Sequence, residues 1–102
     1  MKRIVEGLVY DTEKAEAIST YEPFSDSTKF QWWRETLYRT KNGHYFLHGE
    51  GGPMSKYANV YPGGASGDEV IRVMTEDEAF EWLTEHDPDK ALEVFPEKIK
   101  EA

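Results

Sequence analysis

An Asn-Gly pair at positions 42 and 43 constrains the fold of this chain more than any other local feature. The surrounding segment, from Phe30 to Leu47, is rich in aromatic and β-branched residues, which favour strands. Asn-Gly is typical of the type I′ turn, in which both central residues need a positive φ angle. The sequence therefore predicts a β-hairpin here. Its predicted pairs are Lys41 with His44, Thr40 with Tyr45, Arg39 with Phe46, and Tyr38 with Leu47.

Turn and cap signals predict the elements on either side of this hairpin. A Glu-Gly turn between apolar runs predicts an N-terminal hairpin over residues 4–10. The Asp-Thr pair that follows can cap a helix over residues 12–21, which has an apolar stripe at helical spacing. Residues 22–29 and the Gly- and Pro-rich residues 49–68 are expected to be loops. Residues 69–74 are then expected to form another strand.

The C-terminal third predicts two helices. Thr75 and Glu78 form a capping box, in which each side chain can hydrogen-bond the backbone N–H of the other. Asp87-Pro88 is a typical start for a second helix, and Pro96 marks its end. The predicted fold class is α+β, a small antiparallel sheet with about three helices packed on one face. We expect one domain over residues 1–96 and a polar tail over residues 97–102.

Charge is unevenly distributed along the 102 residues. Residues 1–48 carry seven basic and seven acidic residues, whereas residues 49–102 carry five and thirteen. The whole net charge of −8 therefore resides in the second half. Cysteine is absent, which excludes disulfides and thiolate chemistry. Neither a signal peptide nor an apolar run of the roughly 18–20 residues that span a membrane is visible, so we expect a cytoplasmic protein without a membrane partner.

The acidic surplus suggests a docking surface on the first C-terminal helix. Asp77, Glu78, Glu81 and Glu85 recur there at intervals of three and four residues. Like charges at that spacing destabilise a helix by roughly 0.2–0.5 kcal/mol per pair. A chain that tolerates this cost can use the negative field to attract a basic protein surface, which is the partner that we predict. The alternative is a solvated helix face that only keeps the protein in solution.

A second candidate surface is the basic and aromatic face of the Asn-Gly hairpin. Strand alternation predicts that one face is core and that the other combines cationic with aromatic side chains. Such a combination can grip phosphates and stack on bases, so a small nucleic-acid-binding module is the alternative function. The chain has neither a basic surplus nor a known nucleic-acid motif, and a solvated strand face explains the same residues. The face would consist of Trp33, Arg39, Lys41, His44 and Phe46.

Catalytic chemistry has no comparable pattern. His44 and His48 lie four residues apart on a predicted strand, about 13 Å at roughly 3.3 Å per residue, too far to share a metal ion. His86 is flanked by acids that do not converge with it on a helix. Gly49–Gly52 lacks the Lys-Ser/Thr pair of a phosphate-binding loop. We therefore predict a non-enzymatic protein without catalytic residues, metal site or cofactor, and leave its oligomeric state open.

The opening pattern Ile4-x-x-Gly7-x-x-Tyr10-Asp11-Thr12-Glu13-x-Ala15 resembles small uncharacterised proteins of phages and mobile elements in Gram-positive bacteria. The likeness continues through residues 35–41, 43–52, 55–57 and 75–83, and covers about residues 4–85. Glu6-Gly7 stands where the pattern would have Asn-Gly. The resemblance implies a phage-encoded or mobile-element inhibitor of a host nucleic-acid-binding protein, similar to anti-CRISPR proteins. It supplies no activity and no binding residues.

Overall fold

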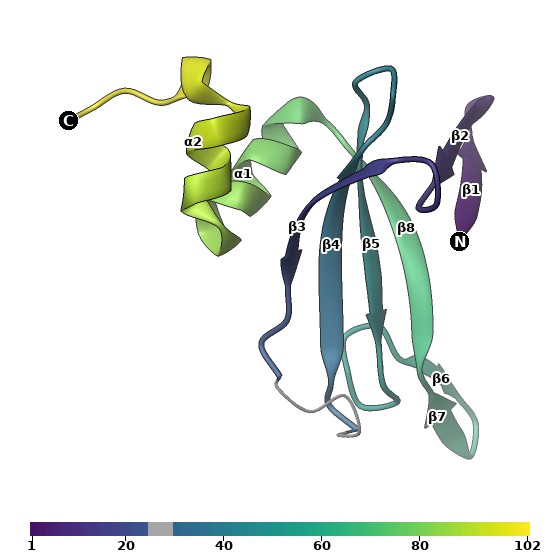
Figure 1. Cartoon of the computed structure of the whole chain (residues 1–102). Coiled ribbons are helices and arrows are strands. Elements are labelled where there is room, and N and C mark those ends of the chain that lie inside the picture. Colours follow the sequence, from purple (N-terminus) through teal and green to yellow (C-terminus); the bar gives the residue numbers. More distant parts are fainter. Residues whose placement is uncertain (25–29) are drawn as a thin grey trace.

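The computed structural model describes residues 1–24 and 30–102, and its centre is a four-stranded antiparallel sheet (Figure 1). The strand order is β3-β4-β5-β8, so neighbours in the sheet are mostly neighbours along the chain. Two separate two-stranded hairpins, β1-β2 and β6-β7, project from it. The strands are β1 (Lys2–Val5), β2 (Leu8–Asp11), β3 (Glu16–Tyr21), β4 (Trp33–Arg39), β5 (Tyr45–Gly51), β6 (Asn59–Tyr61), β7 (Gly64–Ser66) and β8 (Asp68–Met74).

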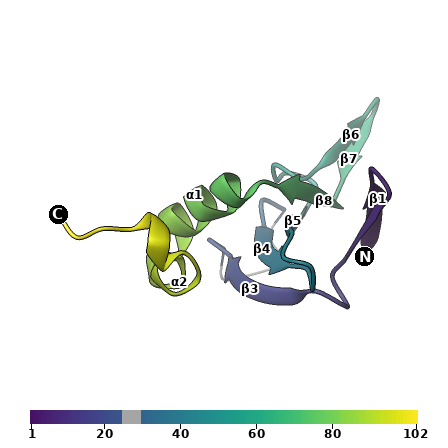
Figure 2. The same cartoon turned by 90° about the horizontal axis from the view of Figure 1, so that it is seen from above.

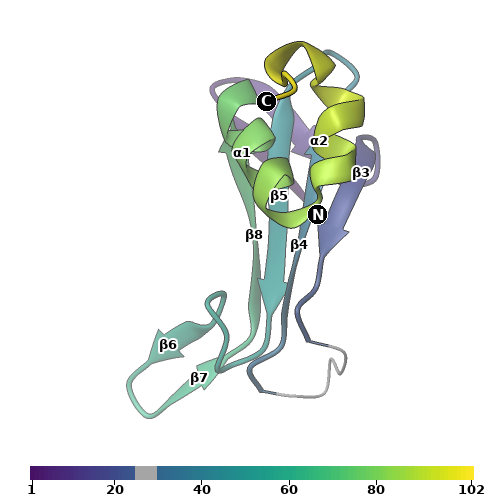
Figure 3. The same cartoon turned by 90° about the vertical axis from the view of Figure 1, so that its left-hand side faces the viewer.

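Two helices, α1 (Glu76–His86) and α2 (Pro88–Val94), pack on one face of this sheet, and a 3-10 turn (Pro96–Lys98) follows them. The predicted capping box at Thr75 is present, and the Asp87 side chain caps α2. Figure 3 shows that the helices cover the upper part of the sheet and do not reach the lower ends of the strands. The core on this face consists of Leu37, Tyr45, Leu47, Met74, Ala79, Trp82, Leu83, Ala91 and Phe95.

The N-terminal hairpin lies on the opposite side of the sheet from the helices (Figure 2). Its predicted Glu6-Gly7 turn is confirmed, with φ angles of 51° and 79° at the two central residues. Tyr10 from this hairpin packs with Phe46 and Ile71 in a second, smaller core. Arg3 fixes the hairpin to the sheet edge, since its guanidinium donates a 2.7 Å hydrogen bond to the Ile71 carbonyl.

The predicted helix over residues 12–21 is wrong. The cap signal at Asp11 produces a single turn, in which the N–H groups of Lys14 and Ala15 both donate to the Asp11 carbonyl. The chain then extends into β3 and pairs with β4, with a bulge between Ala17 and Ser19. Isoleucine, serine and threonine are weak helix formers, so partnering with an available strand prevails over the local helical pattern. The described residues therefore contain two α-helices rather than about three.

The predicted register of the Asn-Gly hairpin is wrong by one residue. Arg39 pairs with Tyr45, and Tyr38 pairs with Phe46. The Thr40 carbonyl accepts from Gly43 N–H at 2.9 Å, and Gly43 is the only described residue of this turn with a positive φ. These are the features of a three-residue loop closed by glycine, which adds one residue relative to the predicted type I′ turn. This one-residue shift of register changes which side chains of the hairpin share a face.

The stretch predicted as a loop over residues 49–68 is partly ordered into strands. β5 continues to Gly51, and β6 and β7 form a short hairpin beyond it. The predicted strand over 69–74 is present as β8. Of the predicted loop over residues 22–29, residues 25–29 lie outside the described part of the chain. Within residues 1–24 and 30–102, neither helix is long and apolar enough to cross a membrane.

Candidate binding cleft

A cleft of about 610 Å³ opens on the helix side of the sheet, where the cover of α1 ends. Its floor is the paired row Glu35, Gly49 and Val70, contributed by β4, β5 and β8. Residues 52–58, which follow β5, fold back to close one side. We call this site the aromatic cleft. Its other lining residues are Tyr21, Trp33, Leu47, Lys56, Tyr57, Arg72, Trp82, Glu85 and His86.

A buried carboxylate organises the base of the aromatic cleft. The Glu35 side chain is only 5% exposed and receives three donors. Trp82 Nε1 donates to Oε1 at 2.9 Å, the Tyr57 hydroxyl donates to Oε2, and Lys56 Nζ lies 2.7 Å from Oε2. The carboxylate thus links the sheet, helix α1 and the 52–58 loop. A buried charge is tolerated only when it is paired and hydrogen-bonded, and both conditions hold here.

These contacts shift the titration of two groups. Burial alone would raise the pKa of Glu35, but the hydrogen bonds from Lys56, Trp82 and Tyr57 outweigh it and hold the pKa below its usual value. Burial raises the pKa of the Tyr57 hydroxyl, and its hydrogen bond to the Glu35 carboxylate raises this pKa further. At neutral pH Glu35 is therefore ionised and Tyr57 is a proton donor.

The walls of the aromatic cleft are rings that contact one another. The Tyr21 ring stacks on His86 with centroids 4.1 Å apart, and it lies 5.7 Å from the Trp33 centroid. Lys56 Nζ lies 4.2 Å from the Trp33 ring centroid, within the range of a cation–π interaction. The cleft therefore already holds one ammonium group, between an aromatic face and a carboxylate.

Gly49 makes room for the tyrosine that closes this cleft. A Cβ on Gly49 would lie 2.1 Å from Cζ of the Tyr57 ring, far inside van der Waals contact. The backbone of Gly49 needs no positive φ, so an alanine could adopt it. We expect Gly49→Ala to displace the ring, break its hydrogen bond to Glu35, and lower the free energy of unfolding by about 1–3 kcal/mol. Urea unfolding followed by tryptophan fluorescence measures this loss.

A double-mutant cycle isolates the steric cause of that loss. With Tyr57→Ala in the background, the ring is gone and Gly49→Ala should be nearly neutral. An equal cost of Gly49→Ala with and without the ring would contradict the proposed contact between Gly49 and Tyr57.

The predicted acidic residues of α1 have unequal roles. Glu78 is engaged in the capping box, and Asp77 lies 3.1 Å from Lys98 Nζ. Glu81 is exposed and forms no ion pair within the described residues. Glu85 is also exposed, has only a 3.9 Å contact with the adjacent histidine, and lines the aromatic cleft. Two of the four predicted carboxylates therefore remain for a partner, and one of them borders the cleft.

The residues of the predicted nucleic-acid face do not come together. Phe46 is completely buried beneath the N-terminal hairpin, and Trp33 lines the aromatic cleft on the other side of the sheet. Arg39 shares the face of Trp33 by strand alternation, whereas Lys41 and His44 are exposed at the hairpin turn. The one-residue change of register and the cover provided by the N-terminal hairpin explain this dispersal.

The sequence did not identify the network around Glu35. One signal was present. Glu35 lies two residues from both Trp33 and Leu37, so it shares the strand face that points to the core. An acidic residue at a core-facing position needs partners, and these could have been sought. Lys56 and Tyr57 lie in a loop without any pattern that predicts their return to the sheet.

No family model, curated protein or solved structure matches this chain significantly. The resemblance of residues 4–85 to phage and mobile-element proteins therefore stays a prediction, and the aromatic cleft itself is the basis for a function.

Proposed function

We propose that this chain is a non-enzymatic binding protein that receives a basic segment of a partner protein in the aromatic cleft. The observation that carries this proposal is the position of Lys56, whose ammonium group lies over Trp33 and against Glu35. The cleft is also lined by the Tyr21 ring, by the exposed Glu85 and by the cationic Arg72. A lysine or arginine side chain of a partner has the chemistry to bind between the aromatic rings and Glu85.

Two features favour a protein segment as the occupant. Tryptophan and tyrosine are enriched among the residues that contribute most to protein–protein affinity, and the cleft concentrates four of these rings. Charge points to a basic partner, because the chain carries a net charge of −8. Glu85 at the rim and Glu81 on the same helix extend the negative surface away from the cleft. Such a field accelerates the encounter with a cationic partner.

The resemblance to phage and mobile-element proteins suggests where a basic segment of this kind occurs. Host nucleic-acid-binding proteins present arginine- and lysine-rich surfaces to phosphate groups. A binding protein that occupies such a surface would act as an inhibitor, in the manner of an anti-CRISPR protein.

Charge reversal on α1 tests this proposal. The probes are fluorescein-labelled 12-residue peptides rich in arginine and lysine, with glutamate-rich peptides of the same length for comparison. We expect the unmodified protein to bind the basic peptides. The double variant Glu81→Lys with Glu85→Lys should bind them at least about tenfold more weakly, because attraction becomes repulsion. Fluorescence anisotropy measures the affinity, and added salt should weaken it by screening.

The matched control is Glu6→Lys with Glu13→Lys, which makes the same charge change in the N-terminal hairpin and the turn after it. The control should bind as the unmodified protein does, within about twofold at high salt, where long-range charge effects are screened. Equal losses in both double variants would reject a specific role for α1. Binding of labelled DNA or RNA in place of the peptides would instead support the nucleic-acid alternative.

A further inference from the structure

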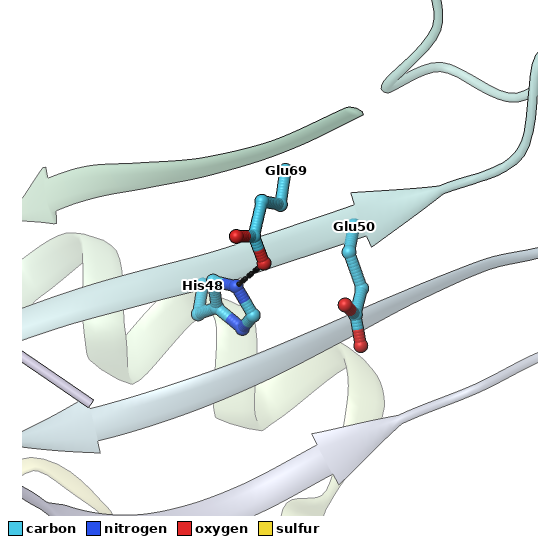
Figure 4. A group of neighbouring side chains, drawn as sticks. All are labelled: His48, Glu50 and Glu69. Atoms are coloured by element: carbon cyan, nitrogen blue, oxygen red, sulfur yellow. Dashed lines mark hydrogen bonds and ion pairs between the residues drawn. The ribbon is translucent and has the colours of Figure 1, made fainter. Parts of the chain in front are cut away.

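Three potential metal ligands lie close together on the sheet face opposite the aromatic cleft (Figure 4). His48 and Glu50 lie two residues apart on β5, so both project to the same side of the sheet. Glu69 on β8 pairs directly with Glu50 and therefore shares that side. The antiparallel register of two neighbouring strands brings the three side chains together. Sequence spacing alone could not indicate this, because Glu69 lies 19 positions beyond Glu50.

The distances in this group are short. His48 Nε2 lies 3.0 Å from Glu69 Oε2, and one ligand atom from each of the three residues lies within 4.8 Å of the others. The His48 side chain is 14% exposed, Glu50 24% and Glu69 47%, so the group is partly shielded and still open to solvent. Zinc binds nitrogen and oxygen ligands at about 2.0–2.2 Å, which requires ligand atoms roughly 3–3.5 Å apart. The ligand atoms of this group lie within 4.8 Å of one another, so they would move closer together on binding a cation.

We propose that His48, Glu50 and Glu69 form a binding site for a first-row divalent cation such as Zn²⁺. One imidazole nitrogen and two carboxylate oxygens are a ligand set that such ions accept, and they leave at least one position for water or a partner's side chain. The cation would also relieve the repulsion between two carboxylates that face each other across neighbouring strands. The site lies on the other side of the sheet from the aromatic cleft and does not depend on the function proposed for it.

Arg34 is the competitor of a cation at this site. Its guanidinium donates to Glu50 Oε1, from Nε at 3.0 Å and from Nη2, and it also approaches Glu22 at 3.5 Å. Since Arg34 engages one oxygen of Glu50, the other oxygen can face the cation. Arg34 therefore orients the Glu50 carboxylate and limits the affinity by its positive charge.

Titration of the untagged protein with ZnCl₂ in an isothermal calorimeter tests the site. We expect one Zn²⁺ per chain, with affinity at least about tenfold lower in His48→Ala and in Glu69→Gln, each of which removes a ligand. His44→Ala, which removes an exposed histidine outside the group, should bind as the unmodified protein does. Circular dichroism before each titration shows that a variant is folded, and Glu69→Gln serves if His48→Ala is not.

Imidazole NMR signals assign the bound ion to a residue. On addition of Zn²⁺ the ring resonances of His48 should shift, whereas those of His44 and His86 should not. Absence of binding to the unmodified protein, or binding that neither ligand variant weakens, would overturn the proposed site.

Discussion

Replacing Phe46 by alanine is expected to lower the free energy of unfolding by about 3–5 kcal/mol, the usual cost of deleting a buried phenylalanine ring. Phe46 is completely buried between the sheet and the N-terminal hairpin. Its ring stacks on Tyr38 at a centroid distance of 5.0 Å and meets the edge of Tyr10 at 5.7 Å. Removal of the ring would leave a cavity that the two-stranded hairpin above it cannot fill without shifting. Thermal or urea unfolding measures the loss.

Phe30→Ala is the matched control, because the same side chain is 64% exposed there. We expect this variant to stay within about 0.5 kcal/mol of the unmodified protein, as surface substitutions usually do. The sequence-based hypothesis of an exposed basic and aromatic face makes the opposite prediction for Phe46, namely little effect on stability and a loss of nucleic-acid binding. A Phe46→Ala variant as stable as Phe30→Ala would therefore restore that hypothesis and contradict the observed packing.

The hairpin that contains Phe46 shows how far sequence reasoning reaches. Its existence, its two strands and its turn residues were all predictable from Asn42-Gly43 and its neighbours. The register was not predictable, because a loop with one more residue also places Gly43 at a positive φ. That single residue shifts the pairing of the two strands by one position, which changes the side chains that share a face. Local signals thus specify the element, whereas the core decides its register.

The wrong prediction over residues 12–21 has a related cause. The cap and the apolar stripe were correct local observations, and the cap does form one turn at Asp11. The outcome depended on β4, a partner strand more than ten residues away, which the local pattern does not contain. The two C-terminal helices were predictable because their capping residues and apolar faces agree, as the Thr75 and Asp87 caps show.

The aromatic cleft was less predictable than the fold. Its walls come from β3, β4, the 52–58 loop and α1, so no sequence window contains them. Glu85 was predicted from helical spacing, and its position at the rim of the cleft became evident only with the packing of α1 over the sheet. The carboxylate that organises the cleft, Glu35, could be suspected only as an acid on a core-facing strand position.

Glu35→Gln is expected to lower the free energy of unfolding at pH 7 by about 1.5–3 kcal/mol, the range of hydrogen bonds to a charged group. The amide keeps the shape of the carboxylate and can still accept from Trp82, but it loses the charge that pairs with Lys56. Lys56 is about half exposed and can turn to water, which keeps the loss below that of a fully buried pair. The control Glu93→Gln removes a surface partner of Lys90 and should cost less than about 1 kcal/mol.

The pH dependence of this difference identifies the charge as its cause. The pKa of Glu35 is lowered in the folded protein, so the ionised carboxylate contributes stability that is complete above the usual glutamate pKa of about 4.3. That contribution disappears as the pH falls through the lower pKa of the folded state, because protonated glutamic acid resembles glutamine. The gap between the unmodified protein and Glu35→Gln should therefore be widest near neutrality and narrow below about pH 4. Urea unfolding of both proteins from pH 7 to pH 3 measures it, and a gap of constant size would mean that shape rather than charge holds the aromatic cleft together.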